Sequence, residues 1–154
     1  MKHRAIRMSV ASGCLWGLIG LAVAVLGTRP SMNQPGMTLR DAATAFAGGL
    51  VAAPIIGVLM GLLSRPFRHL PVPLRIIVAG GSLYCAVLLF LVANGLMWAV
   101  RSGRLPQDFW FNSVASAWAI LVWTWFFIFL WPLAYVTHML VSRAWDRDAF
   151  RTAG

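Results

Sequence analysis

Charged residues are absent from four long stretches of the chain. These stretches lie between Arg7 and Arg29, between Asp41 and Arg65, between Arg75 and Arg101, and between Asp108 and Arg143. Each is at least as long as the roughly 20 apolar residues that cross the hydrocarbon core of a bilayer. Helices are required, because backbone polar groups in lipid must be paired within their own segment. The pattern predicts an all-α membrane protein with four transmembrane helices, at about 8–27, 42–63, 76–100 and 115–141.

A repeat in the sequence organises these four helices into two pairs. Residues 54–65 (PIIGVLMGLLSR) return 78 positions later as residues 132–143 (PLAYVTHMLVSR), with five identical positions. The first helices of the pairs also align, with Arg7 on Arg75 and Gly13 on Gly81. We therefore expect residues 1–154 to form one transmembrane domain of two tandem hairpins, at about 7–65 and 75–143. Such repeats enter the membrane in the same direction and are parallel, unlike the inverted repeats of many transporters.

Composition agrees with a membrane environment. Hydrophobic residues make up 60% of the chain and charged residues 11%, whereas soluble domains are roughly 45–50% apolar. A soluble domain with this composition would leave large apolar patches exposed. The first apolar run could also be a signal peptide, but it is longer than the usual 7–15 residues of such a segment.

The basic residues are distributed unequally between the two predicted sides of the membrane. If the N-terminus is cytoplasmic, the inner segments carry nine basic residues and the outer loops four. The inner residues are Lys2, Arg4, Arg7, Arg65, Arg68, Arg75, Arg143, Arg147 and Arg151, and the outer ones are Arg29, Arg40, Arg101 and Arg104. This follows the positive-inside rule and predicts cytoplasmic termini. The net charge of +9 is thus explained by orientation and anionic headgroups, with no nucleic-acid partner.

Small residues and prolines mark where these helices are expected to pack and bend. Small residues recur at intervals of four, at Ser9, Gly13 and Gly17 in the first helix and at Gly57 and Gly61 in the second. Such residues let helix backbones approach closely, either within one chain or in a dimer. Pro54 and Pro132 fall inside predicted helices, where a proline removes a backbone hydrogen bond and kinks the helix.

His138 is the one histidine inside a predicted span, near its inner end. Ionisable groups within membranes are candidates for function. It shares a helix face with Trp123, Phe127 and Trp131, and an Ala-x-x-x-His spacing around it is also found at chlorophyll ligands. Its counterpart in the repeat is Met60, and both residue types ligate haem. Haem or chlorophyll binding and an interfacial, hydrogen-bonded histidine are the alternative interpretations.

No recognised catalytic motif occurs in the chain, and no predicted span contains Asp, Glu, Lys or Arg. Proton relays and ion-coupled transporters usually place such a group within the membrane. The sequence therefore favours a non-enzymatic inner-membrane protein, either an accessory subunit of a membrane complex or a homo-oligomer. A small transporter or channel for a neutral or lipophilic solute is the alternative. The twelve arginines against one lysine are typical of a GC-rich bacterial genome.

The second half of the chain resembles an uncharacterised family of small bacterial membrane proteins with two helices. In that family a helix leads through a short outer loop with a glycine and an aromatic residue to a helix with a proline and a basic end. Here the resemblance is carried by Gly103, Asp108-Phe109, Pro132-Leu133 and Arg143. The first half differs in its outer loop. The resemblance implies a duplicated hairpin and carries no known activity.

Overall fold

The computed structural model describes residues 3–27, 38–105, 107–123 and 126–150. These residues form helices joined by short connections and contain no strand. In chain order the elements are α1 (His3–Gly27), α2 (Leu39–Ala45), α3 (Ala47–Leu63), the 3-10 helix η1 (Phe67–His69), α4 (Val72–Ser102), α5 (Phe109–Trp123) and α6 (Phe126–Phe150). The all-α fold expected from the sequence is confirmed.

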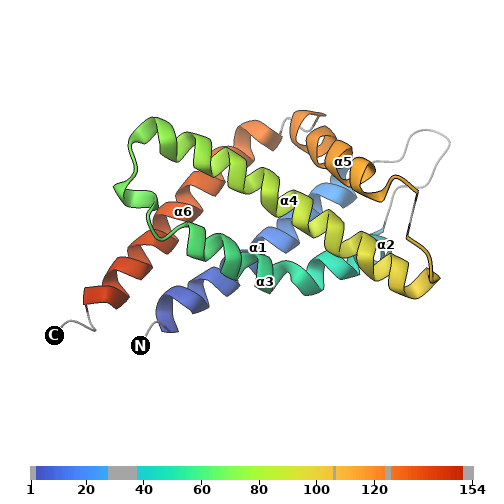
Figure 1. Cartoon of the computed structure of the whole chain (residues 1–154), viewed down its shortest axis with the longest axis horizontal. Helices are drawn as coiled ribbons and strands as arrows, with labels where there is room; N and C mark the ends of the chain where they lie inside the picture. The colour runs from blue at the N-terminus through green and yellow to red at the C-terminus, as the bar shows by residue number, and fades with distance from the viewer. Residues whose placement is uncertain (1–2, 28–37, 106, 124–125, 151–154) are drawn as a thin grey trace.

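The long helices run back and forth between two ends of the molecule (Figure 1). The start of α1, the link through η1 and the end of α6 lie at one end, and the connection from α4 to α5 lies at the other. Helix α1 packs against α3 and α6, and α4 packs against α3, α5 and α6. Three helical segments, in α1, in α3 through η1 and in α4, are long and apolar enough to cross a membrane. The molecule is therefore built as a membrane-embedded protein.

The predicted fourth span falls on α5 and α6. Helix α5 ends at Trp123 and α6 begins at Phe126, and residues 124–125 lie outside the described part of the chain. The charge-free stretch from Asp108 to Arg143 is longer than the roughly 20 residues that one crossing needs. The 15 residues of α5 extend about 22 Å, less than the hydrocarbon thickness of about 30 Å. The described residues on both sides of 124–125 are helical.

The predicted second span is divided near its N-terminal end. Helix α2 ends at Ala45 and α3 begins at Ala47. Helical hydrogen bonds continue across the junction, from Phe46 N–H to the Ala42 carbonyl (2.9 Å) and from Leu50 N–H to the Phe46 carbonyl (3.0 Å). The Phe46 ring lies 6.0 Å from the ring of Phe90 on α4. The junction is therefore packed against α4, close to Gly48 and Gly49, which face it.

The small residues predicted to mediate packing lie between α1 and α3. A Cβ atom on Gly13 would overlap the Ala53 carbonyl and the Gly57 Cα, and one on Gly57 would overlap the Ser9 carbonyl and the Gly13 Cα. Gly61 faces the Ser9 hydroxyl in the same way, and Gly17 faces the Ala53 side chain. These residues let the two backbones touch, which supports packing within one chain.

Both predicted helix-breaking prolines lie inside helices, Pro54 in α3 and Pro132 in α6. Neither has an N–H to donate to the carbonyl four residues earlier. Helix kinks at these positions remain a prediction.

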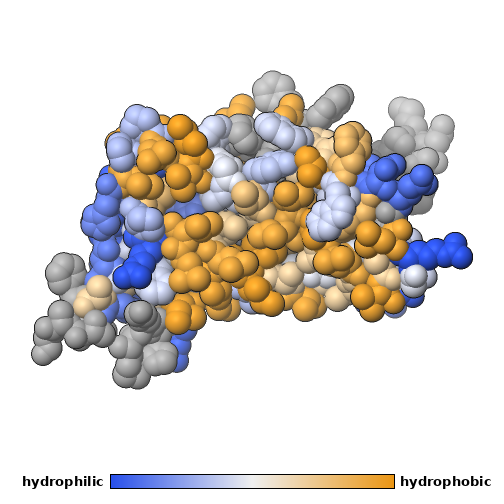
Figure 2. Space-filling view, in the orientation of Figure 1, coloured by the Kyte–Doolittle hydropathy of each residue, from blue (hydrophilic) through white to orange (hydrophobic). Residues whose placement is uncertain are grey.

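An apolar belt separates two polar ends of the molecule (Figure 2). Large apolar side chains on every long helix are exposed, among them Leu18, Ile55, Ile77, Trp118 and Leu133. Of the described arginines, seven are at the end where α1 begins: Arg4, Arg7, Arg65, Arg68, Arg75, Arg143 and Arg147. A surface of this kind is suited to lipid around the belt and to water and headgroups at the ends.

We expect Gly57→Ala to destabilise the protein by about 1–3 kcal/mol, because the added methyl group overpacks a backbone contact. Gly20→Ala is the matched control, since a Cβ there meets nothing within 4 Å and alanine favours helix by up to about 1 kcal/mol. Thermal unfolding of the purified variants in detergent measures both. Equal midpoints for the two variants would show that α1 and α3 do not touch at these glycines.

Candidate functional site

His138 lies at the meeting point of three elements. It is on α6, is 5% exposed, and faces Ser64, Phe67 and Ser82. Ser64 directly follows α3, Phe67 is in η1, and Ser82 is in α4. Side chains of α4 and η1 contact His138, and its place near the inner membrane interface remains a prediction.

Both ring nitrogens of His138 are bound by serine hydroxyls. Nδ1 is 2.6 Å from Ser64 Oγ, and Nε2 is 2.5 Å from Ser82 Oγ. The Phe67 ring, fully buried, stacks on the imidazole with its centroid 5.0 Å away and an interplanar angle of 24°. Phe67 also contacts Tyr135 in an edge arrangement, with ring centroids 5.3 Å apart and an interplanar angle of 70°. The imidazole is therefore fixed at both nitrogens and covered on one face.

The hydroxyl and imidazole groups of this cluster have few hydrogens to share among several acceptors. Each serine oxygen also lies near a carbonyl of its own helix, Ser64 at 2.7 Å from Met60 O and Ser82 at 2.9 Å from Ala79 O. A hydroxyl has a single hydrogen to donate. If both serines donate to their carbonyls, both must accept from His138, which is then an imidazolium ion. A neutral imidazole accepts from one serine, and that serine no longer donates to its carbonyl. Either arrangement bonds both ring nitrogens.

A serine beside a histidine is the first part of a nucleophile–base pair, but this cluster lacks the remaining parts. The group that orients the imidazole is a second serine and not a carboxylate, the usual third member. Ser64 is 2% exposed and Ser82 8%, so neither hydroxyl is open to a substrate. The cluster joins helices.

The geometry also bears on cofactor binding. A haem iron or chlorophyll magnesium needs one free ring nitrogen, so a bound pigment would have to displace Ser64 or Ser82. The described residues contain no group of three His, Cys, Asp or Glu side chains that could hold a metal ion. Trp131 donates its indole N–H to the Ile76 carbonyl at 2.9 Å. The side chains of Trp123 and Phe127, expected on the same face, lie outside the described part.

A second polar network holds the basic end together. Asp148 accepts a hydrogen bond from Ala5 N–H at 3.0 Å. This N–H belongs to the first turn of α1, whose N–H groups lack helical partners. Trp145 donates its indole N–H to the Gly61 carbonyl at 2.9 Å, and Arg68 forms an ion pair with Asp146 at 2.6 Å. Helix α6 is thereby tied to α1, α3 and the η1 link.

The predicted inner-interface arginines have different environments. Arg75 binds the η1 link, with Nε 2.7 Å from the Leu70 carbonyl and Nη2 2.7 Å from the Arg68 carbonyl. Arg7, Arg65 and Arg143 are exposed. Ser142, the repeat counterpart of Ser64, is fully buried. Its hydroxyl lies 3.3 Å from both the Arg65 carbonyl and the Arg68 N–H.

Sequence reasoning identified His138 and missed its serine partners. The repeat alignment placed His138 opposite Met60, and in space its neighbour is Ser64, whose hydroxyl lies near the Met60 carbonyl. One signal could have suggested the serines. A histidine within a membrane helix needs polar partners, and few polar side chains lie at the same depth of the predicted spans. Nothing in the local sequence indicated the hydrogen bond between Asp148 and the first turn of α1.

Comparisons with family models, with curated proteins and with solved structures found no match to this chain.

We expect Ser64→Ala and Ser82→Ala each to destabilise the protein by about 1–3 kcal/mol, because each leaves one buried nitrogen of His138 without a partner. Thr137→Ala is the control on the neighbouring position, since the Thr137 hydroxyl binds only its own helix, at the Leu133 carbonyl. Unfolding titrations with a denaturing detergent compare the three variants. Indistinguishable curves would contradict a stabilising role for the cluster.

Proposed function

We propose that this chain is a non-enzymatic, multi-pass protein of a bacterial inner membrane. In this proposal it acts by packing, as an accessory subunit of a membrane complex or as a homo-oligomer. Every buried side-chain nitrogen or oxygen in the described part of the chain has a hydrogen-bond partner. Because the interior polar groups bind one another, no such group is left for a substrate. This observation carries the proposal, because it leaves the outer surfaces as the part of the protein that would act.

The orientation of the proposed protein follows from its charges. Both termini would be cytoplasmic, because the end with the start of α1, the link and the end of α6 is richer in arginine. A cytoplasmic excess of Lys and Arg sets the orientation of most membrane proteins. The outer loops would then be the segment after α1 and the connection from α4 to α5.

Helix α4 is the surface that we propose for a protein partner. It has 31 residues, which extend about 46 Å, and 17% of its apolar window is buried, compared with 28% for α1 and 33% for α3. The small residues at the α1–α3 contact are already used within the chain. Association through bulky apolar side chains of α4 therefore fits the structure better than association through a glycine stripe.

A relation to the two-helix hairpin family is part of the proposal. The residues that carry the resemblance have the following places in this chain. Gly103 ends α4 in the left-handed conformation, with φ of 70°, and Phe109 begins α5, where its ring packs against Gly95. Pro132 and Leu133 are inside α6, ahead of its basic end. The order of a helix, a connection and a second helical segment is compatible with the proposed relation.

The alternative functions have direct tests. A transporter or channel for a neutral or lipophilic solute would change solute flux across liposomes that contain the protein. Pigment or haem binding through His138 would give the purified protein a visible absorption band. Both ring nitrogens of His138 are engaged by serines, which favours the structural interpretation of this residue.

We expect the protein purified in mild detergent to have a protein mass above the 16.9 kDa of one chain, through self-association or a retained partner. Ile77 on α4 and Ile55 on α3 are matched in exposure, at 65% and 64%. Ile77→Trp should reduce the associated fraction by obstructing close packing along α4, and Ile55→Trp should not. Light scattering coupled to size exclusion measures both variants.

A monodisperse monomer with no retained protein would overturn the packing proposal. Equal loss of association in both tryptophan variants would instead remove α4 as the contact surface.

A further inference from the structure

We propose that the basic end contains a binding site for the headgroup of an acidic phospholipid, formed by Arg68, Arg143 and Arg147. The proposal depends on the chain being embedded in a membrane and is independent of any protein partner. These three arginines and Asp146 line a cavity of about 340 Å³ between η1 and the last turns of α6. Ligand cavities usually measure about 300–1,000 Å³, so this one is suited to a small polar group.

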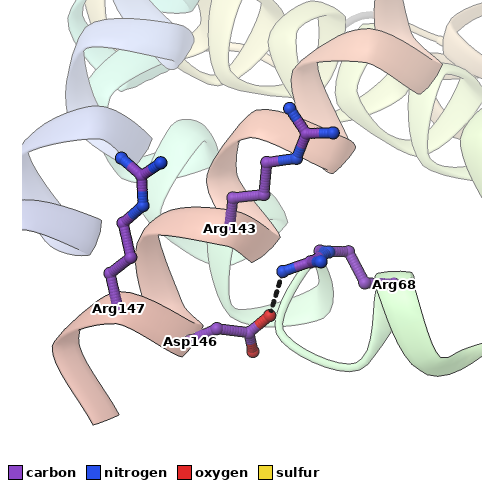
Figure 3. Close-up of a pocket in the computed structure, with 4 residues that line it drawn as sticks. All are labelled: Arg68, Arg143, Asp146 and Arg147. Carbon is purple, nitrogen blue, oxygen red and sulfur yellow. Dashed lines mark hydrogen bonds and ion pairs between the residues drawn. The ribbon is translucent and has the colours of Figure 1, made fainter. Parts of the chain in front are cut away.

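The arrangement of the three arginines favours an anion (Figure 3). Arg143 and Arg147 are four residues apart on α6, on one face of the helix, and both side chains extend to the same side. Arg68 approaches from η1 and is held by Asp146, with Nη1 2.6 Å from Oδ2. The same carboxylate lies 3.6 Å from His69 Nε2. Asp146 thus fixes one arginine in place.

The cavity has unbalanced positive charge. Three arginines and one aspartate leave a net charge of three minus one, or +2. Within the described part of the chain, the guanidinium groups of Arg143 and Arg147 form no hydrogen bond or ion pair. Guanidinium groups bind phosphate oxygens in a bidentate manner with charge-assisted hydrogen bonds. The two unpaired guanidiniums are therefore available to a phosphate group.

The surface beside the cavity identifies the source of this phosphate as a lipid. Toward the middle of α6, the face that carries the two arginines continues as an exposed apolar stripe with a spacing of three and four residues. Its members are Phe129, Leu133, Val136 and Leu140, which are 40–72% exposed. A phospholipid has the matching form, with acyl chains for the stripe and a phosphate for the arginines. Basic pockets on the cytoplasmic side of membrane helices are known to bind acidic headgroups.

Lipid titration of the full chain in detergent, followed by native mass spectrometry, tests the proposal. We expect phosphatidylglycerol to bind at least about tenfold more tightly than phosphatidylcholine, because only the former has a net negative charge. Arg143→Gln with Arg147→Gln should reduce this preference to threefold or less. The matched control is Arg101→Gln with Arg104→Gln, an exposed pair at the opposite end, which should keep the preference. Thermal unfolding of both double variants establishes that each is folded.

Three results would overturn the proposal. The first is equal binding of the two lipids by the unmodified protein. The second is an equal loss of preference in both double variants, which would mean that the attraction is spread over the whole surface. The third is displacement of phosphatidylglycerol by about 10 mM inorganic phosphate, which would identify a site for free phosphate.

Discussion

The structure depends on one constraint, that polar groups surrounded by lipid must be paired inside the protein. The backbone meets it by forming helices throughout the described part of the chain. The interior side chains meet it through short hydrogen bonds between elements. His138 is bound by Ser64 and Ser82, and Trp145 is bound by the Gly61 carbonyl. Between the two polar ends the surface is largely apolar, as suits contact with lipid.

Two kinds of contact hold the helices to one another under this constraint. Between α1 and α3 the backbones meet directly, because Gly13 and Gly57 present no side chain. Helix α6 is held by polar contacts instead, from His138 to α3 and α4 and from Asp148 to the first turn of α1. Lipid is as apolar as the helix surfaces, so no hydrophobic effect drives the helices together. Close packing and hydrogen bonds hold them instead.

Much of the fold could be predicted, because hydrophobic length alone decides which segments can cross a membrane. The charge-free stretches located α1, α3 and α4, and the spacing of small residues located the α1–α3 contact. The junction between α2 and α3 at Phe46 could not be predicted, since Thr, Ala and Phe are equally compatible with one continuous helix. Only part of the site around His138 could be predicted. His138 stood out as a histidine in an apolar run, whereas its partners come from distant elements whose register the sequence does not set.

The repeated sequence segments also show that position in the sequence does not determine the partner of a side chain. Ser64 and Ser142 occupy equivalent positions and are both buried, but Ser64 binds a side chain of α6 and Ser142 binds the backbone of the η1 link. Equivalent sequence positions therefore have different partners, because Met60 in one copy corresponds to His138 in the other. The contacts that make the site arise where the two similar sequence segments differ.

The central claim is that the helices cross a membrane with the arginine-rich end in the cytoplasm. Cysteine labelling in intact cells tests it most directly, after Cys14 and Cys85, both free, are replaced by serine. Single cysteines at Leu105, between α4 and α5, and at His69, in the η1 link, would then report the two ends. A membrane-impermeant thiol reagent is expected to label position 105 in intact cells and position 69 only after the membrane is opened. Labelling of both positions in intact cells, or of position 69 alone, would contradict the account.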